Sequence, residues 1–138
     1  MAETVEFELV SPERLVISEP VEMVIVPGAE GDFGALPRHA PMITAVRPGV
    51  IDVYQGGKVS QRIFVAGGFV EVTETRVTML AEEAMKVGDL VADEVEARVK
   101  ASKDAIDAAD GEAARQLAQR SLAVALAMKD ALISKKAH

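Results

Sequence analysis

The chain has 138 residues and a formal net charge of −7, and it contains no cysteine. Its length suits one ordinary domain or two small ones, and 49% hydrophobic and 27% charged residues are typical of a folded globular protein. The absence of cysteine excludes disulfides and thiolate metal sites, and the acidic balance argues against nucleic acid as a partner, because that affinity comes mostly from neutralising phosphates.

The hydropathy pattern argues against direct insertion into a membrane. The longest stretch without a charged side chain is eight residues, for example Ser121–Met128. A membrane-spanning helix needs about 20 consecutive apolar residues. The chain opens on Met1-Ala2-Glu3, without a basic region followed by an apolar one, so we expect no secretory signal.

Alternating apolar and polar residues predict strands in the first part of the chain. Val5, Phe7 and Leu9 alternate with Glu6 and Glu8, which is the period of a half-buried strand. Further strands are predicted at Val21–Val26, Met42–Val46, Val50–Tyr54, Val59–Val65, Phe69–Thr73 and Val77–Leu80. Turn residues separate these runs and no helical pattern comes between them, which favours an antiparallel β-sandwich or barrel.

The composition changes sharply near Gly88. All six prolines and nine of the ten glycines lie at or before this residue, whereas 14 of the 50 residues after it are alanine. Proline, glycine and β-branched residues favour turns and strands, while alanine favours helices. We therefore expect a β-domain over residues 1–88 and a helical domain over residues 89–138.

Two apolar stripes predict two helices in this second domain. Asp89 is expected to cap the first helix, and Gly111 is expected to end it in the left-handed conformation. The first stripe comprises Val91, Val95, Val99, Ser102, Ile106 and Ala109. The second comprises Leu117, Ser121, Val124, Met128 and Ala131, widened by Ala118, Leu122, Ala125 and Leu132. The short break predicts an antiparallel helical hairpin, and the fold class is α+β.

No catalytic, cofactor or metal motif stands out. The two histidines, His39 and His138, have no metal-ligand spacing, and His39 is interpreted as a structural or interface residue. The segment Gly28–Gly34 is glycine-rich, but it carries two acidic residues, so an exposed turn is favoured over a phosphate site. Gly67-Gly68 predicts a strand bend or a close backbone approach. We expect no catalytic residue, no cofactor and no metal.

A long central segment resembles a known family. It contains Gly-x-x-Gly-x-x-Gly, then Pro-x-His-Ala-Pro, then a Thr-Ala and a Pro-Gly pair. The blocks that carry the resemblance are Gly28–Val50, Val65–Val72, Val77–Ala81 and Leu9–Glu13. Along essentially its whole length, the chain resembles the epsilon subunit of F-type ATP synthase.

The resemblance implies a sandwich of about ten short strands followed by a helical hairpin. It implies a non-catalytic central-stalk (rotor) subunit of a proton-translocating ATP synthase, bound peripherally at the cytoplasmic face of the bacterial inner membrane. The expected partners of the sandwich are the gamma subunit and the ring of c subunits, whose rotation it couples to ATP synthesis in the catalytic head of alpha and beta subunits. The helices are expected to dock on the sandwich or to extend toward that head and inhibit ATP hydrolysis.

The resemblance also implies contact residues. Glu30, Gly31 and Asp32 form an acidic segment that is expected to meet basic loops of the c-ring, with complementary charge setting rate and register. His39 and Pro41 are expected at the interface with gamma. The candidates for contact with the catalytic head are Arg98, Lys100, Lys103, Arg115 and Arg120.

Two other functions are open from the sequence. One is a stand-alone ATP-sensing regulator that uses Arg98 and Lys100. Some family members bind ATP through an Ile/Leu-Asp-x-x-Arg-Ala motif, but here Asp93 is followed three residues later by Glu96 instead of arginine, which argues against ATP binding. The other is a small hydrolase that uses His39 and an acidic partner, although no nucleophile motif accompanies it.

Overall fold

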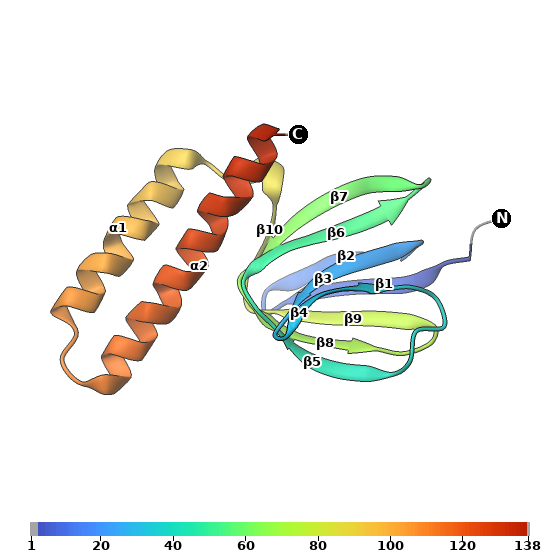
Figure 1. The fold of residues 1–138 in the computed structure, drawn as a ribbon, viewed down its shortest axis with the longest axis horizontal. Coiled ribbons are helices and arrows are strands. Elements are labelled where there is room, and N and C mark those ends of the chain that lie inside the picture. Colours follow the sequence, from blue (N-terminus) through green and yellow to red (C-terminus); the bar gives the residue numbers. More distant parts are fainter. Residues whose placement is uncertain (1–2, 138) are drawn as a thin grey trace. The chain divides into compact units, whose positions relative to one another are not determined.

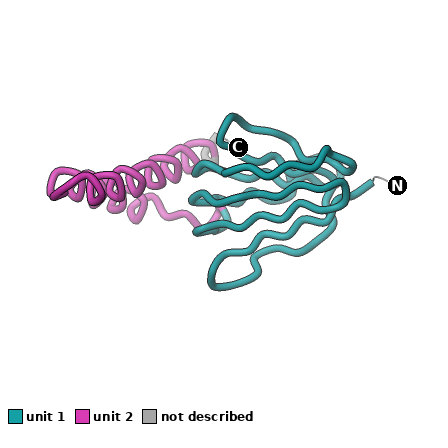
Figure 2. Tube along the Cα trace, turned by 90° about the horizontal axis from the view of Figure 1, so that it is seen from below, with its two compact units in different colours: residues 1–86 teal, residues 87–138 magenta. Residues whose placement is uncertain are grey.

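The computed structural model describes residues 3–137, and the chain divides into two compact units, residues 1–86 and residues 87–138 (Figures 1 and 2). Within the described residues, the first unit contains ten strands: β1 (Val5–Ser11), β2 (Arg14–Val21), β3 (Met23–Gly28), β4 (Gly31–Ala35), β5 (Met42–Val46), β6 (Gly49–Gln55), β7 (Lys58–Val65), β8 (Gly68–Val72), β9 (Arg76–Ala81) and β10 (Ala84–Lys86). The second unit contains the short 3-10 helix η1 (Val87–Asp89) and the helices α1 (Ala92–Ala108) and α2 (Glu112–Ala137).

The strands form one continuous ladder in the order β10-β7-β6-β3-β5-β8-β9-β1-β2, and β4 pairs with β3 beside that path. The ladder folds over so that its two ends enclose a common interior (Figure 1). Neighbouring strands run antiparallel except for β1 and β9, which run parallel. The predicted α+β class, with a β-sandwich followed by a helical hairpin, is confirmed.

Buried and outward-facing residues alternate along the strands, and the buried ones form the core of the sandwich. Val5, Phe7 and Leu9 of β1 are completely buried, while Glu6 faces solvent and Glu8 lies part-buried on the same outer side. The same rule places residues of β2, β3 and β5–β9 in one apolar cluster. Burial of a Val, Leu or Phe side chain stabilises a fold by about 1.5–3 kcal/mol relative to exposure, so this cluster holds the two layers together.

Three strands, β2, β4 and β10, were not predicted. β2 contains Pro20 and lies at the end of the ladder, where a missing backbone donor is tolerated. The glycine-rich segment was interpreted as an exposed turn, but Gly28 pairs with Gly31 across a turn of only two residues, Ala29 and Glu30. The rest of this segment is strand, and Asp32 therefore lies on β4 and not in the turn.

The close backbone approach predicted at Gly67-Gly68 is confirmed. Gly68 has a φ of 141°, in a region that L-residues rarely adopt. A Cβ atom at this position would overlap the carbonyl oxygen of Leu80 on the neighbouring strand β9. Only glycine lets β8 and β9 pair at this point.

The helix boundaries differ from the prediction. Asp89 belongs to η1, and Val91 is the N-cap of α1, without a side-chain cap hydrogen bond. Asp93 in the first turn complements the helix dipole instead. Gly111, with a φ of 97°, does not end α1, which closes at Ala109 in an extended conformation. The carbonyl oxygen of Gly111 accepts a hydrogen bond from Arg115 N at 3.2 Å, so Gly111 is the N-cap residue of α2.

Small side chains fill the contact between the two helices. The buried residues of the two helices are Val95, Val99 and Ser102 of α1 and Ala118, Val124, Ala125, Met128 and Ala131 of α2. The prediction was wrong at the start of α2, because Leu117 is 66% exposed and Ser121 is exposed, while Ala118 takes the inward position. An ion pair between Lys129 Nζ and Glu96 Oε1, at 3.1 Å, joins the helices at their surface.

Candidate partner-binding surfaces

The β3–β4 turn presents one of the two predicted acidic contacts. Gly28 and Gly31 pair at its base, and the φ of 141° at Gly31 gives the tight reversal. Glu30 is exposed at the tip and has no ion-pair or hydrogen-bond partner within residues 3–137. A carboxylate in this position is accessible to a cationic group of an external partner.

Arg47 ties this turn to the end of β5, and sequence reasoning missed it. Its Nε donates a hydrogen bond to the carbonyl oxygen of Gly28 at 2.9 Å, and its Nη2 pairs with Asp32 Oδ1. Two backbone bonds of 2.9 Å, from Arg47 N to Pro27 O and from Ala29 N to Ala45 O, run alongside. The partners are distant in the sequence, so only the β3–β5 pairing could have revealed the contact.

The loop between β4 and β5, residues 36–41, lies at the other end of β4 from Glu30. Arg38 has a φ of 66°, which is uncommon for a residue with a side chain. Its backbone N donates to the carbonyl oxygen of Glu74 at 2.7 Å, and its Nη2 lies 2.6 Å from Glu3 Oε2. These contacts fix the loop to the turn between β8 and β9.

His39 and Pro41, the predicted gamma-interface residues, lie in this loop. His39 is half-buried, its Nδ1 donates to the carbonyl oxygen of Ala40 at 2.7 Å, and its ring centroid lies 6.2 Å from that of Phe33. Pro41 is exposed. Within residues 3–137, His39 has no hydrogen bond to a carboxylate or hydroxyl, so the geometry gives the hydrolase hypothesis no support.

An exposed apolar row crosses the outer face of five neighbouring strands. Its members are paired in register from β2 to β5, in the order Leu15, Val10, Leu80, Phe69 and Ala45. Leu15 is 58%, Leu80 56% and Phe69 60% exposed. We call these five residues the outer apolar row. The sequence pattern predicted four of these five strands, all except β2, but did not distinguish this outward set from ordinary surface positions.

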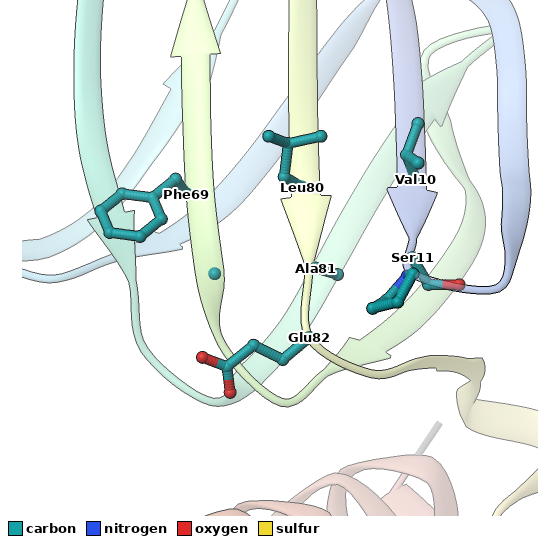
Figure 3. A pocket seen from close by; sticks show the side chains of 8 residues that line it. Val10, Ser11, Phe69, Leu80, Ala81 and Glu82 are labelled. Atoms are coloured by element: carbon teal, nitrogen blue, oxygen red, sulfur yellow. The ribbon is translucent and has the colours of Figure 1, made fainter.

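A shallow hollow of about 340 Å³ lies at the edge of the outer apolar row (Figure 3). Phe69 and Leu80 project from adjacent strands beside it, and Glu82 lies at the end of β9. Its lining residues are Val10, Ser11, Pro12, Gly68, Phe69, Leu80, Ala81 and Glu82. The next row across the same face carries Glu8, Thr78 and Glu71, so acidic side chains border the apolar ones.

The five basic residues proposed for the catalytic head are exposed on the two helices. Lys100 Nζ pairs with Asp104 Oδ2 at 3.1 Å on α1. Lys103 follows on the same side, whereas Arg98 lies two residues before Lys100 and thus about 200° around the helix. The positions on α2 are Arg115 and Arg120. The three cations of α1 therefore do not share one face of that helix. The two cations of α2 are five residues apart and do not share one face either.

The described residues contain no cluster of three or more histidines and carboxylates able to hold a metal ion. Within the same residues, every buried side-chain nitrogen or oxygen has a hydrogen-bond partner. No helix in residues 3–137 is both long and apolar enough to cross a lipid bilayer.

Comparisons of the chain with family models and with known proteins point to the same family. Residues 4–87 match the family model described as ATP synthase, Delta/Epsilon chain, beta-sandwich domain. The ATP synthase epsilon chain of Paramagnetospirillum magneticum is 60% identical over 132 residues, which cover 96% of this chain and 99% of the relative. The ATP synthase epsilon chain of Rhodospirillum rubrum is 59% identical over 128 residues, which cover 93% of this chain and 96% of the relative.

Solved structures share the fold at low identity. A chain in the structure of the Euglena gracilis mitochondrial ATP synthase OSCP, F1 and c-ring superimposes with a TM-score of 0.81 and 22% identity, covering 96% of this chain and 83% of that one. A chain in the structure of the Tetrahymena thermophila mitochondrial ATP synthase central stalk and c-ring superimposes with a TM-score of 0.72 and 15% identity, covering 95% of this chain and 98% of that one. With the match of the family model and with relatives near 60% identity over almost their whole length, the chain belongs to the ATP synthase epsilon chain family.

Proposed function

We propose that this chain is the non-catalytic central-stalk subunit of a proton-translocating ATP synthase. It binds the gamma subunit and the ring of c subunits and transmits the rotation of that ring to the catalytic head. It is a peripheral component at the cytoplasmic face of the bacterial inner membrane. Its membership of the epsilon chain family and its fold, shared with chains of central-stalk and c-ring structures, support this function.

The outer apolar row is the observation that carries the proposal. It places three large apolar side chains, each more than half exposed, along one line across the outer face of the sandwich, beside a row that carries two glutamates. Contiguous exposed apolar surface on a soluble protein marks an interaction site. We assign this face, together with the β4–β5 loop that carries His39 and Pro41, to the gamma subunit.

The β3–β4 turn supplies a second contact, to the c-ring. Its acidic tip suits basic side chains on the ring, as the family resemblance implies. The turn is also joined to the gamma-binding face, because Ala29 N bonds to the carbonyl oxygen of Ala45, which belongs to the outer apolar row. A short, hydrogen-bonded path between two contacts transmits torque without a flexible segment.

The hairpin carries the regulatory part of the proposal. The contact between α1 and α2 buries mostly alanine, valine and serine, which contribute little apolar area each. A weakly packed hairpin opens at small free-energy cost, and its exposed cations then meet acidic segments of the catalytic head. We propose that this contact inhibits ATP hydrolysis and does not depend on ATP binding to the hairpin.

A binding measurement with purified gamma subunit tests the proposal. Phe69→Glu is expected to weaken binding at least tenfold, because a central aromatic side chain in an interface commonly contributes about 2 kcal/mol or more. Leu117→Glu is the matched control, since Leu117 is equally exposed but lies on α2. Circular dichroism verifies that both variants fold. Wild-type affinity in the folded Phe69→Glu protein would remove the outer apolar row from the gamma interface.

A further inference from the structure

The two acidic residues at the β3–β4 hairpin have different surroundings. Asp32, the second residue of β4, pairs with the guanidinium of Arg47, while Glu30 stands at the tip without a partner in residues 3–137. The sequence prediction assigned both carboxylates the same contact with the c-ring. The structure separates them.

Arg47 holds both sides of the turn. One nitrogen, Nε, reaches the carbonyl oxygen of Gly28 on the incoming strand, and another, Nη2, reaches the carboxylate of Asp32 on the outgoing strand. Its own backbone N bonds to Pro27 O. A planar guanidinium with several donors in fixed directions can bridge two acceptors in this way, whereas a lysine ammonium acts as a point charge on a flexible stem.

We infer that Arg47 is a positioning residue, which neutralises Asp32 and fixes the turn so that Glu30 alone supplies the carboxylate for a cationic side chain of the partner. The inference rests on the proposed contact of this turn with the c-ring and refines it. The two negative charges of the hairpin and the positive charge of Arg47 leave one net negative charge. That charge is carried at the exposed tip.

Fixing the turn favours binding because less conformational freedom is lost when the complex forms. Asp32 pairs through one oxygen and its side chain stays 65% exposed, so a partner cation beside Asp32 would also meet the positive guanidinium of Arg47. Glu30 has no cation beside it in residues 3–137. The arrangement therefore gives the contact a defined position and a single charge.

The test uses full-length chains assembled into the ATP synthase complex in sealed vesicles. The measured quantity is the ratio of ATP-driven proton pumping to ATP hydrolysis. Glu30→Gln removes the proposed contact charge. The double variant Asp32→Asn with Arg47→Gln removes both charges of the internal pair while keeping groups that can form hydrogen bonds. Glu74→Gln, on the exposed turn between β8 and β9, is the matched control for loss of one surface carboxylate.

The two carboxylates are expected to differ in the size of the effect. Glu30→Gln is expected to lower the pumping ratio about threefold, in the range of an exposed charge pair. Glu74→Gln is expected to keep the wild-type ratio. The double variant is expected to lower the ratio by less than about twofold, because it keeps the charge of Glu30 and only loosens the turn. In the isolated full-length chain, Arg47→Gln is expected to speed amide hydrogen exchange at residues 29–31 by about threefold, and Arg47→Lys is expected to restore the protection only in part.

Two results would overturn the inference. The first is a double variant that loses as much pumping as Glu30→Gln, because Glu30, which is unchanged there, would then not be the carboxylate that supplies the contact. The second is unchanged hydrogen exchange in Arg47→Gln, which would show that Arg47 does not fix the turn. Failure of the proposed function has a different signature: the wild-type chain would neither bind gamma nor restore coupled pumping to a complex that lacks it.

Discussion

The sandwich and the hairpin bury very different side chains. Large residues such as Phe7, Leu9 and Ile51 fill the sandwich interior, and each is completely buried. In the described part of the hairpin, Met128 is the largest buried side chain of the two helices, and most of the other buried residues are alanine and valine. Since stabilisation grows with buried apolar area, at roughly 25 cal/mol per Å², the sandwich gains far more from packing. A strongly packed unit suits torque transmission, and a weakly packed one suits regulation.

The largest effect is expected in the sandwich core. Phe7→Ala should lower the free energy of unfolding of the sandwich by about 3–5 kcal/mol, because it leaves a cavity among residues that are already close-packed. Urea denaturation followed by circular dichroism measures this change. Leu15→Ala is the control, since Leu15 is mostly exposed and its truncation is expected to change stability by less than about 0.5 kcal/mol. Equal losses for the two variants would contradict the assigned core.

Gly68→Ala tests the close approach of β8 and β9. The added methyl group would overlap the carbonyl oxygen of Leu80 and force the strands apart, so a loss of about 3 kcal/mol is expected. Gly57→Ala provides the comparison, because Gly57 also has a positive φ but has open space around it. That variant should lose only about 1 kcal/mol, from backbone strain alone. Similar losses at both positions would show that the steric contact contributes nothing.

A chain that ends at Gly88 sharpens the comparison between the units. We predict that residues 1–88 fold without the helices, because the sandwich has its own apolar cluster. The truncated chain should give a β-type circular dichroism spectrum and a cooperative thermal transition. An unfolded spectrum at about 20 °C, near the temperature of maximum stability of many proteins, would refute independent folding.

The smallest effect is expected from nucleotide binding and regulation by the hairpin. Calorimetric titration of ATP into the full-length chain should show no micromolar binding, because Glu96 stands where the family's ATP-binding motif has arginine.

Removal of residues 89–138 should raise ATP hydrolysis by the complex modestly at low salt and less at high salt. Charge contacts near the surface are screened over about 8 Å at physiological ionic strength, which gives this salt dependence. Micromolar ATP binding would refute the prediction that the chain does not bind the nucleotide. Equal rates of ATP hydrolysis with and without residues 89–138 at low salt would refute the prediction that the hairpin inhibits.

Periodicity in the sequence was enough to predict most strands and both helices. It failed where the local pattern was silent: β2 alternates poorly and contains Pro20, and β4 begins in a glycine-rich run. Helix ends were misplaced at Asp89 and Gly111, because either residue can occupy more than one position near a helix end.

The candidate surfaces were harder to predict from the sequence than the fold. Motif spacing drew attention to Glu30 and Asp32, but the pairing of Asp32 with Arg47 depends on strands that come together only in the folded sheet. The outer apolar row likewise joins five strands. Its members are separate along the chain, so no local window of the sequence contains the surface.

The central claim is that the sandwich couples rotation and the hairpin only regulates. The most direct measurement is the ratio of proton pumping to ATP hydrolysis in vesicles with an ATP synthase complex that lacks this chain, after addition of either the full-length chain or residues 1–88. The account predicts that both restore the ratio to the same value and that only the full-length chain slows hydrolysis at low salt. A ratio that residues 1–88 fail to restore, although they are folded and bound to gamma, would contradict it.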